Sequence, residues 1–278
     1  MTLKRNDLIA QMEKGCKKRR DFRIGVEHEK FGFHKATLKP IGYEDITRIF
    51  EGFMAEGWKG REEGGKVIAL AKGGATITLE PGGQFELSSA PLGTLHETQK
   101  KLDEHILALK KIAEPLDIGF LPIGFAPHWK LPDMPHMPKQ RYEYMLAIMP
   151  KTGSRGLDMM YRTATVQVNL DYESEGDMVL KMRTALSLQP IVSTIFANAP
   201  FYEGAPSAQV SERVHCWLDV DGARGGASPF IFDEGAGFAS YIDWALQVPL
   251  YFVIRDGKFL SGSGRCFPDF MEGKLPGL

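Results

Sequence analysis

The feature of this sequence that most constrains its fold is a strict alternation of polar and apolar residues in several short segments. In residues 23–33, Glu27 and Glu29 fall on one face of an extended strand, whereas Ile24 and Val26 fall on the other. The same alternation occurs at 76–88, 163–171, 213–220 and 250–255. Because a period of two is typical of half-buried strands, these segments predict a sheet with one apolar and one polar face.

Helical segments with an apolar stripe lie between these strands. Residues 94–116 place leucines at seven-residue intervals, and Thr94 with Glu97 forms a capping-box pattern at the start. Residues 177–198 repeat the stripe, although Pro190 is expected to kink or split that helix. The proline-rich stretch 119–138 is expected to be an irregular loop. Shorter helices are predicted at 4–18, 43–56, 139–148 and 237–246.

The order of these segments predicts the fold class. The strand lengths and the Pro-Gly-Gly turn at 81–83 favour antiparallel or mixed pairing over βαβ units. No long linker or internal repeat divides the chain, so residues 1–278 are expected to form a single domain. We therefore expect an α+β fold in which helices cover the apolar face of a mainly antiparallel sheet.

The polar faces of the predicted strands carry an unusual set of side chains. A polar face in a half-buried sheet commonly meets water, and for one strand that interpretation would be preferred. A solvated face is usually built of Lys, Glu and Thr, whereas these faces carry Gln, Asn, Arg and Trp beside clustered glutamates. This composition favours a functional surface.

Four glutamates give the strongest chemical signal. Glu27 and Glu29 would lie about 6–7 Å apart on one strand face, and Glu80 and Glu86 flank the Pro-Gly-Gly turn. Carboxylates held this close repel one another, and a hard cation such as Mg²⁺ relieves the repulsion. A lone Glu-x-Glu pair is more often a solvated edge, but its recurrence beside the turn favours several Mg²⁺ ions that hold a polyphosphate. His28 points to the other face by parity and is expected to be a satisfied core histidine.

The sequence contains no familiar phosphate-binding loop. It lacks GxxxxGK[ST], and no GxGxxG follows a predicted strand. A nucleotide would therefore be held through metal ions and through arginines, whose planar guanidinium groups match carboxylate and phosphate oxygens. The candidates are Arg141, Arg162 and Arg213, although each one taken alone is as consistent with a surface ion pair.

Composition and charge argue against several classes of protein. The formal net charge is −1, so neither nucleic acid nor an anionic membrane is expected as a partner. The longest apolar stretch is too short to span a bilayer, and the first ten residues do not resemble a signal peptide. Cys16, Cys216 and Cys266 are scattered and lack CxxC spacing, which argues against a disulfide framework or a zinc site. We expect a cytoplasmic enzyme with reduced cysteines.

A series of motifs resembles those of the plant-type glutamate–cysteine ligases, a group shared by plants and many proteobacteria. The motifs are VEHEKFGF, LEPGGQFELS, MPKQRYEYM, GLDMMYRTATVQVNLDY, ANAPFYEG and GKLPGL, and the resemblance runs from about residue 20 to the last residue. These ligases belong to the glutamine synthetase-like carboxylate–amine ligases. The resemblance implies a strongly curved sheet, shaped like a saddle or funnel, with helices outside.

The resemblance also implies a reaction and a set of site residues. ATP would phosphorylate the γ-carboxylate of glutamate, and the cysteine amine would attack the γ-glutamyl phosphate, in the first step of glutathione biosynthesis. Such phosphoryl transfer requires positioning and charge neutralisation more than a protein nucleophile. The implied roles are Mg²⁺ binding by Glu27, Glu29, Glu80, Glu86 and Gln167, catalysis by Arg141 and Arg213, a glutamate pocket of Thr163, Thr165 and Val166, and a cysteine site of Trp217 and Tyr251.

Some of these assignments stay open. Ordinary packing explains Trp217 and Tyr251 about equally well, and distant relatives place a metal-binding histidine at the position of Gln167. Members of the family continue beyond the GKLPGL motif, so the chain is expected to be an N-terminal part that lacks some of the ATP-binding wall. Gly262 and Gly277 replace the redox-active cysteines of plant members, which predicts no disulfide switch in this segment.

The same residues are also consistent with three other functions. The first is a ligase of the same superfamily with a different amine acceptor. The second is a non-catalytic module that binds metal and nucleotide. The third is a metal-dependent phosphohydrolase, which would hydrolyse ATP without glutamate.

Overall fold

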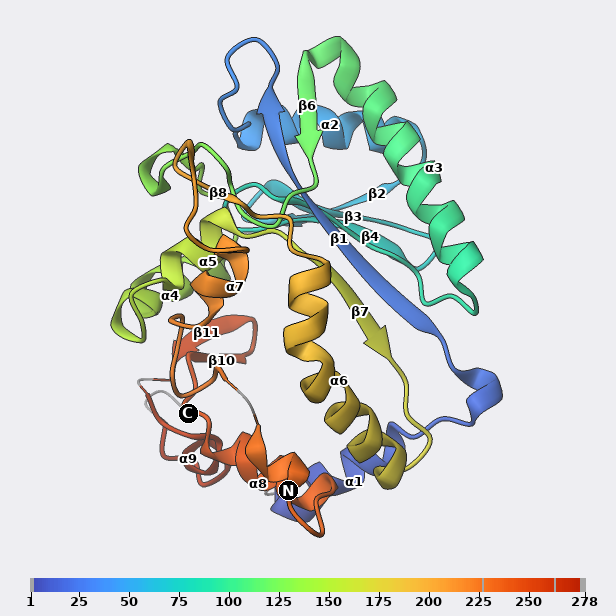
Figure 1. Cartoon of the computed structure of the whole chain (residues 1–278), viewed down its shortest axis with the longest axis vertical. Coiled ribbons are helices and arrows are strands. Elements are labelled where there is room, and N and C mark those ends of the chain that lie inside the picture. The colour runs from blue at the N-terminus through green and yellow to red at the C-terminus, as the bar shows by residue number, and fades with distance from the viewer. Residues whose placement is uncertain (1–2, 227, 263, 276–278) are drawn as a thin grey trace.

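The main sheet of the protein is built around one long strand, β1 (Ile24–His34). The computed structural model describes residues 3–226, 228–262 and 264–275. Within these ranges, the sheet has seven strands in the order β2-β3-β4-β5-β1-β6, with β7 also paired to β1, and every pairing between them is antiparallel (Figure 1). The other strands are β2 (Lys59–Glu63), β3 (Lys66–Lys72), β4 (Ala75–Leu79), β5 (Phe85–Ser88), β6 (Ile118–Leu121) and β7 (Val166–Leu170).

Two helices cover one face of this sheet. α2 (Tyr43–Ala55) packs against β2 and β3, and α3 (Leu95–Ala113) packs against β1 and β6. The largest buried cluster lies between these helices and the strands, and includes Phe50, Phe53 and Phe85 with Leu70 and Ile77. Apolar residues of the alternating strands therefore meet the apolar stripes of the helices, as the sequence predicts.

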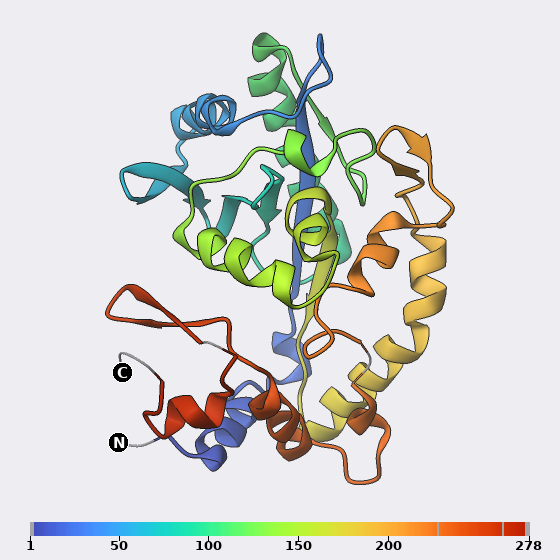
Figure 2. The same ribbon diagram turned by 90° about the vertical axis from the view of Figure 1, so that its left-hand side faces the viewer.

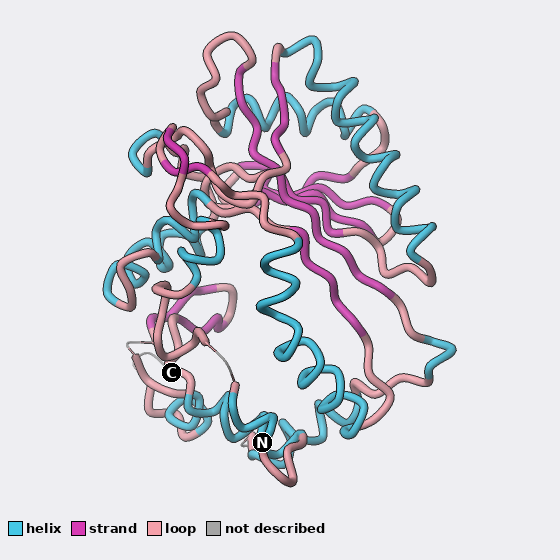
Figure 3. The backbone as a smooth tube through the Cα atoms, viewed as in Figure 1, coloured by secondary structure: helices cyan, strands magenta, loops and turns pink. Residues whose placement is uncertain are grey.

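The remaining elements form a second group beside the sheet (Figures 1 and 2). α1 packs on α8, where the guanidinium of Arg5 forms an ion pair with Asp243 at 2.5 Å. Two hairpins, β8–β9 and β10–β11, are separate from the main sheet, and Figure 3 shows β10–β11 lying apart from its strands. The elements are α1 (Arg5–Lys14), α4 (Gln140–Ile148), α5 (Gly156–Arg162), α6 (Glu175–Ile195), α7 (Glu212–Trp217), β8 (Phe201–Tyr202), β9 (Ala205–Pro206), α8 (Phe238–Gln247), β10 (Phe252–Arg255), β11 (Lys258–Ser261) and α9 (Phe267–Met271).

Most of the predicted helices are confirmed, and their local signals explain where they begin. The Thr94 hydroxyl accepts a hydrogen bond from the Glu97 backbone N–H at 3.2 Å, and the Glu97 carboxylate accepts one from the Thr94 N–H at 3.0 Å. This is the predicted capping box of α3. Of the two outcomes expected at Pro190, a kink or a split, the split does not occur, because α6 continues through this residue.

Several strand predictions need correction. Residues 213–220 do not form a strand, because Glu212–Trp217 is the helix α7, which begins after an N-cap bond from the Val214 N–H to the Ser211 hydroxyl at 3.4 Å. The segment 250–255 contributes β10, which pairs with β11 in a hairpin outside the main sheet. The proline-rich stretch is irregular except that it begins within β6 and contains the 3₁₀ turn Leu131–Asp133.

The apolar face of β7 also differs from the expectation. Val166, Val168 and Leu170 are 57–64% exposed, so no helix in the described part of the chain covers them. The polar face of β7 does meet its neighbour, because Gln167 lies opposite Glu27 in the ladder with β1. The alternation of β7 is therefore as predicted, but its apolar face is not buried.

Three further expectations can be compared with the fold. Cys16, Cys216 and Cys266 are free thiols, as expected. Gly277 lies outside the described residues, so the replacement of the plant cysteines stays a prediction. Within the described ranges, no helix is long and apolar enough to cross a membrane.

Candidate active site

The predicted carboxylates gather on the face of the sheet opposite α2 and α3. Glu29 on β1 lies directly opposite Glu86 on β5, and their antiparallel pairing puts both side chains on the same face. Glu80 follows β4 immediately before the Pro-Gly-Gly turn, and its carboxylate is close enough to Glu86 for that residue to raise the pKa of Glu80. Three of the four predicted glutamates are therefore neighbours.

The turn that carries Glu80 is fixed to the end of α5 by a buried glutamine. The Gln84 amide donates hydrogen bonds to the carbonyl oxygens of Thr163 at 2.7 Å and Met160 at 3.2 Å, and its oxygen accepts one from the Gly82 N–H at 2.9 Å. A Cβ at Gly82 would lie 2.2 Å from the carbonyl oxygen of Tyr161, so no other residue fits there. Gln84 was not among the predicted site residues, although its position beside the two glycines was a usable signal.

A pocket of about 200 Å³ opens between these elements. Its polar lining combines acidic, amide and hydroxyl groups with one guanidinium, and its apolar lining comes from methionines and an indole ring. The lining includes Glu29, Glu80, Thr163, Thr165, Arg213 and Trp217.

Burial and mutual repulsion make the carboxylates of this pocket hard to ionise. Burial, together with the neighbouring Glu80 and Glu86, raises the pKa of Glu29 to about 8, although a hydrogen bond from the Thr165 N–H at 3.1 Å acts in the opposite direction. Burial also raises the pKa of Glu80, although Lys139 and Arg141 act in the opposite direction. A cation bound between these groups would restore their charged form.

Arg213 is the one pocket residue with a buried polar atom that lacks any partner in the described structure. Its Nε is unpaired, and within the described ranges no carboxylate lies within 4.0 Å of its guanidinium. The guanidinium carbon lies 5.7 Å from the centre of the Trp217 ring, one turn along α7. Burial lowers the pKa of Arg213, while Glu29 opposes that change. A partly buried guanidinium that makes no hydrogen bond or ion pair within the described ranges fits a ligand carboxylate or phosphate.

The oxygen ligands in this pocket suit an Mg²⁺ ion that binds together with a phosphate-bearing ligand. No three His, Cys, Asp or Glu side chains within residues 3–226, 228–262 and 264–275 already form a group that could enclose a metal. Mg²⁺ commonly keeps several waters and uses one or two carboxylates together with substrate phosphates. Glu29, Glu80 and Glu86 suit a cation that arrives with a polyphosphate, and they do not form a closed structural metal site.

The other predicted site residues lie at varying distances from this pocket. Glu27 accepts a hydrogen bond from the Gln167 amide at 2.8 Å, and Gln167 lines the pocket. Arg141 on α4 lies 3.5 Å from the Glu80 carboxylate. Val166 is 62% exposed and does not line the pocket. Tyr251 lies in another cavity, where its hydroxyl donates to Asp221 at 2.7 Å.

Two basic residues have roles other than those expected. Arg162 is only 1% exposed and forms ion pairs with Asp158 at 2.7 Å and Glu203 at 3.0 Å, so it is a buried structural residue. Lys139 was not singled out from the sequence. It is buried, donates to the carbonyl oxygen of Leu79 at 2.6 Å, and lowers the pKa of Glu80. Its position beside Arg141 in the motif MPKQRYEYM was the only local signal.

The fold and this pocket define a class of site. An acidic, partly buried pocket with an unpaired guanidinium, on an open antiparallel sheet, is suited to anionic substrates that bind together with divalent cations. Sequence comparison then identifies the family. Residues 23–272 match the family described as glutamate-cysteine ligase family 2, and the chain belongs to it.

The chain is similar to several curated plant proteins. It is 52% identical over 275 residues to glutamate–cysteine ligase A, chloroplastic, of Oryza sativa subsp. japonica, covering 99% of this chain and 56% of that protein. It is 52% identical over 274 residues to the chloroplastic glutamate–cysteine ligase of Nicotiana tabacum, covering 98% and 52%. It is 50% identical over 277 residues to that of Arabidopsis thaliana, covering 99% and 53%. The chain thus spans about half the length of the curated relatives it matches.

Proposed function

We propose that this chain takes part in the ATP-dependent ligation of the γ-carboxylate of glutamate to the amine of cysteine. The observation that carries the proposal is the unpaired Arg213 guanidinium, which lines the same pocket as Glu29 and Glu80. A cationic fork beside a cation-binding acidic group can seat a carboxylate that is also close to a nucleotide phosphate. Membership of glutamate-cysteine ligase family 2 and the names of the relatives support this substrate pair.

Each side chain then has a role that its surroundings allow. Glu29 and Glu86 would hold Mg²⁺, which would neutralise phosphate charge during transfer. Arg213 would bind substrate carboxylate or phosphate oxygens, and Arg141 would act beside Glu80. The Thr165 side chain, which lines the pocket, would help to position glutamate.

The proposed reaction has two steps. An oxygen of the glutamate γ-carboxylate attacks the γ-phosphorus of ATP, and ADP leaves with the bond electrons. The amine of cysteine then attacks the acyl carbon, phosphate leaves, and the nitrogen loses a proton. Catalysis by this chain would consist of placing the reactants in line and stabilising anionic oxygens.

Binding is tested separately from turnover. Calorimetry with glutamate and a non-hydrolysable ATP analogue should give heats that depend on Mg²⁺ and are lost on chelation. The variant Arg213→Ala should lose them, whereas Arg48→Ala, at an exposed position on α2, should keep them. Heats that are the same with and without Mg²⁺ in both variants would overturn the proposed site.

Turnover is tested by ADP release with glutamate and a panel of amines. The expected result is release that needs glutamate and is fastest with cysteine, together with γ-glutamylcysteine as product. Faster release with another amine would support a related ligase, and release without glutamate would support a phosphohydrolase. Mg²⁺-dependent nucleotide binding without ADP from any amine would support a non-catalytic module.

A further inference from the structure

Gly124 joins two segments that build the proposed active site. Its carbonyl oxygen accepts a hydrogen bond from the Ala164 N–H at 3.1 Å. The next residue, Phe125, forms an antiparallel bridge with Thr163, which lines the pocket. On its other side, the Gly124 N–H donates to the side-chain oxygen of Asn198 at 3.1 Å. Gly124 is buried, and these bonds hold it between the wall of the pocket and residue 198.

Asn198 belongs to the segment that fixes the start of α7, the helix that carries Arg213. Ala199 forms a parallel bridge with Ser211, whose hydroxyl caps this helix. The carbonyl oxygen of Ala199 also accepts a hydrogen bond from the Glu212 N–H at 2.9 Å. Asn198 and Ala199 lie in the motif ANAPFYEG, to which the proposed reaction assigns no role. The contacts show that this motif sets where α7 begins.

The side chain of Arg213 passes close to the backbone of Gly124. A Cβ added to Gly124 would lie 3.3 Å from the Cδ of Arg213 and 2.7 Å from the side-chain oxygen of Asn198. The first distance is tighter than an ordinary carbon–carbon contact, and the second is an overlap. Because φ at Gly124 is not positive, glycine is needed here for space and not for backbone conformation. A larger residue would have to displace the arginine stem, the amide of Asn198, or both.

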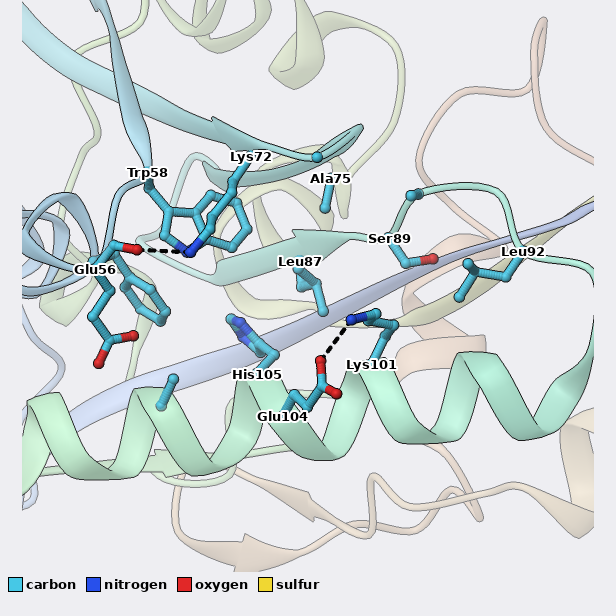
Figure 4. A pocket seen from close by; sticks show the side chains of 14 residues that line it. Glu56, Trp58, Lys72, Ala75, Leu87, Ser89, Leu92, Lys101, Glu104 and His105 are labelled. Carbon is cyan, nitrogen blue, oxygen red and sulfur yellow. Dashed lines mark hydrogen bonds and ion pairs between the residues drawn. The ribbon is translucent and has the colours of Figure 1, made fainter.

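This packing matters because no ion pair within the described ranges holds the guanidinium of Arg213. A cavity of about 460 Å³ on the other face of the sheet shows the opposite case (Figure 4). There the Lys101 ammonium lies 2.7 Å from the Glu104 carboxylate, and the Lys72 ammonium donates to the carbonyl oxygen of Glu56 at 2.7 Å. Those charged groups are held by their partners, whereas the position of Arg213 depends on what its stem packs against.

We propose that Gly124 and Asn198 are positioning residues that set the place of the Arg213 guanidinium in the pocket. Without a Cβ, Gly124 lets the arginine stem lie against the backbone, and the Asn198 amide fixes this glycine relative to α7. The Gly124 carbonyl oxygen is bonded to the pocket wall that carries Thr163, so one residue sets the distance between that wall and the guanidinium. This role rests on the proposed function, in which Arg213 binds carboxylate or phosphate oxygens of a substrate.

Calorimetry of the 278-residue protein with glutamate, Mg²⁺ and a non-hydrolysable ATP analogue tests this role. Gly124→Ala and Asn198→Leu should each weaken binding about five-fold or more, because a displaced guanidinium makes a poorer charge-assisted hydrogen bond to the ligand. Gly176→Ala on α6 is the matched glycine control, because a Cβ added there has nothing within 4 Å. Asn6→Leu, at an exposed position on α1, is the matched asparagine control. Both controls should bind with unchanged affinity.

A second measurement needs no ligand. In the free protein, Gly124→Ala and Asn198→Leu should shift the side-chain ¹⁵Nε signal of Arg213 and the indole ¹⁵N signal of Trp217, whose ring centre lies 5.7 Å from the guanidinium carbon. The two control variants should leave both signals in place. Asn198 is exposed, so Asn198→Leu provides the result if thermal unfolding shows that Gly124→Ala is not folded. Signals that stay in place in the folded variants would overturn the positioning role.

The positioning role and the proposed function fail in different ways. Retained ligand binding in Arg213→Ala would contradict the proposed function. Lost binding in Arg213→Ala, together with full affinity in folded Gly124→Ala and Asn198→Leu, would remove only the positioning role. If Asn198 acts through Arg213, Asn198→Leu should weaken binding less when it is combined with Arg213→Lys than when it is made alone. Equal weakening in both cases would also overturn the positioning role.

Discussion

The two faces of β1 carry ionisable residues in alternation, and the surroundings of these residues differ between the faces. Glu29 points to an open pocket, and burial beside other carboxylates raises its pKa to about 8. His28 and Lys30 point to the side that α3 covers, and they are 8% and 3% exposed. Burial lowers the pKa of His28 to about 4 and that of Lys30 to about 8. Burial disfavours the charged form on both faces, but only one face is open to a cation.

The difference between the two faces shows how the sheet separates stability from function. On the α3 side, large rings fill the space around the polar groups, as in the stack of Phe53, Phe85 and His105. On the carboxylate side, Glu29 and Glu86 repel each other, and no lysine or arginine in the described parts of the chain forms an ion pair with either. Unrelieved electrostatic repulsion between buried carboxylates is typical of sites that bind ligands.

The largest expected effect tests the α3 side. Phe85→Ala should lower the free energy of unfolding by about 3–5 kcal/mol, because the residue is 0% exposed and its ring packs against the rings of Phe50, Phe53 and Phe120. Urea denaturation followed by circular dichroism measures it. Leu107→Ala on the exposed side of α3 is the control and should change stability by less than about 0.5 kcal/mol. A loss below about 1 kcal/mol for Phe85→Ala would contradict the packing described.

The next effect tests the carboxylate side. Glu29→Gln should reduce turnover about 10²- to 10³-fold while leaving the protein at least as stable, because it removes a repelled carboxylate that is also a proposed metal ligand. ADP release and urea denaturation give the two readings. Glu51→Gln, at an exposed position on α2, should change neither. Lost stability with retained activity in Glu29→Gln would reverse the comparison between the faces.

Arg213→Lys should have an intermediate effect. Replacing the planar fork by an ammonium should weaken binding of glutamate or nucleotide about ten-fold or more, since a hydrogen bond to a charged group is lost. Calorimetry measures the change, and Arg48→Lys on α2 is the matched control. Equal affinity in both variants would remove Arg213 from the ligand site.

The smallest effect is the change in stability between pH 7 and 8 without Mg²⁺. Above about pH 4.5 the unfolded Glu29 loses its proton, whereas the folded group keeps it up to about pH 8, so the unfolded state binds fewer protons. Stability should therefore fall as pH rises between these values, by at most about 1.4 kcal/mol per pH unit from this group. Denaturation midpoints between pH 7 and 8 should show the fall, and Glu29→Gln or added Mg²⁺ should reduce it. An unchanged slope in Glu29→Gln would assign the fall to other groups.

The sequence by itself determined the elements whose signals are local. Period-two alternation located β1, β4, β5 and β7, and the capping box of Thr94 located the start of α3. Parity alone put Glu29 and Glu86 on the polar faces. The same pattern gave a wrong prediction at 213–217, where the helix α7 forms. Arg213 and Trp217 are four residues apart, and this spacing puts them on one face of a strand but also one turn apart on a helix. A short segment can satisfy both periods.

Only the tertiary structure decided which faces are covered and which distant groups meet. Two contacts join segments that are far apart in the chain: Glu29 lies opposite Glu86, and the Gln84 amide bonds to the Thr163 carbonyl oxygen. The burial of the unpaired Arg213 Nε also depends on the packing of distant segments. The exposed valines of β7 and the separate cavity of Tyr251 are likewise long-range outcomes. Periodicity fixes the direction of a side chain relative to its own strand or helix, whereas its neighbours and its exposure depend on the packing of other elements against it.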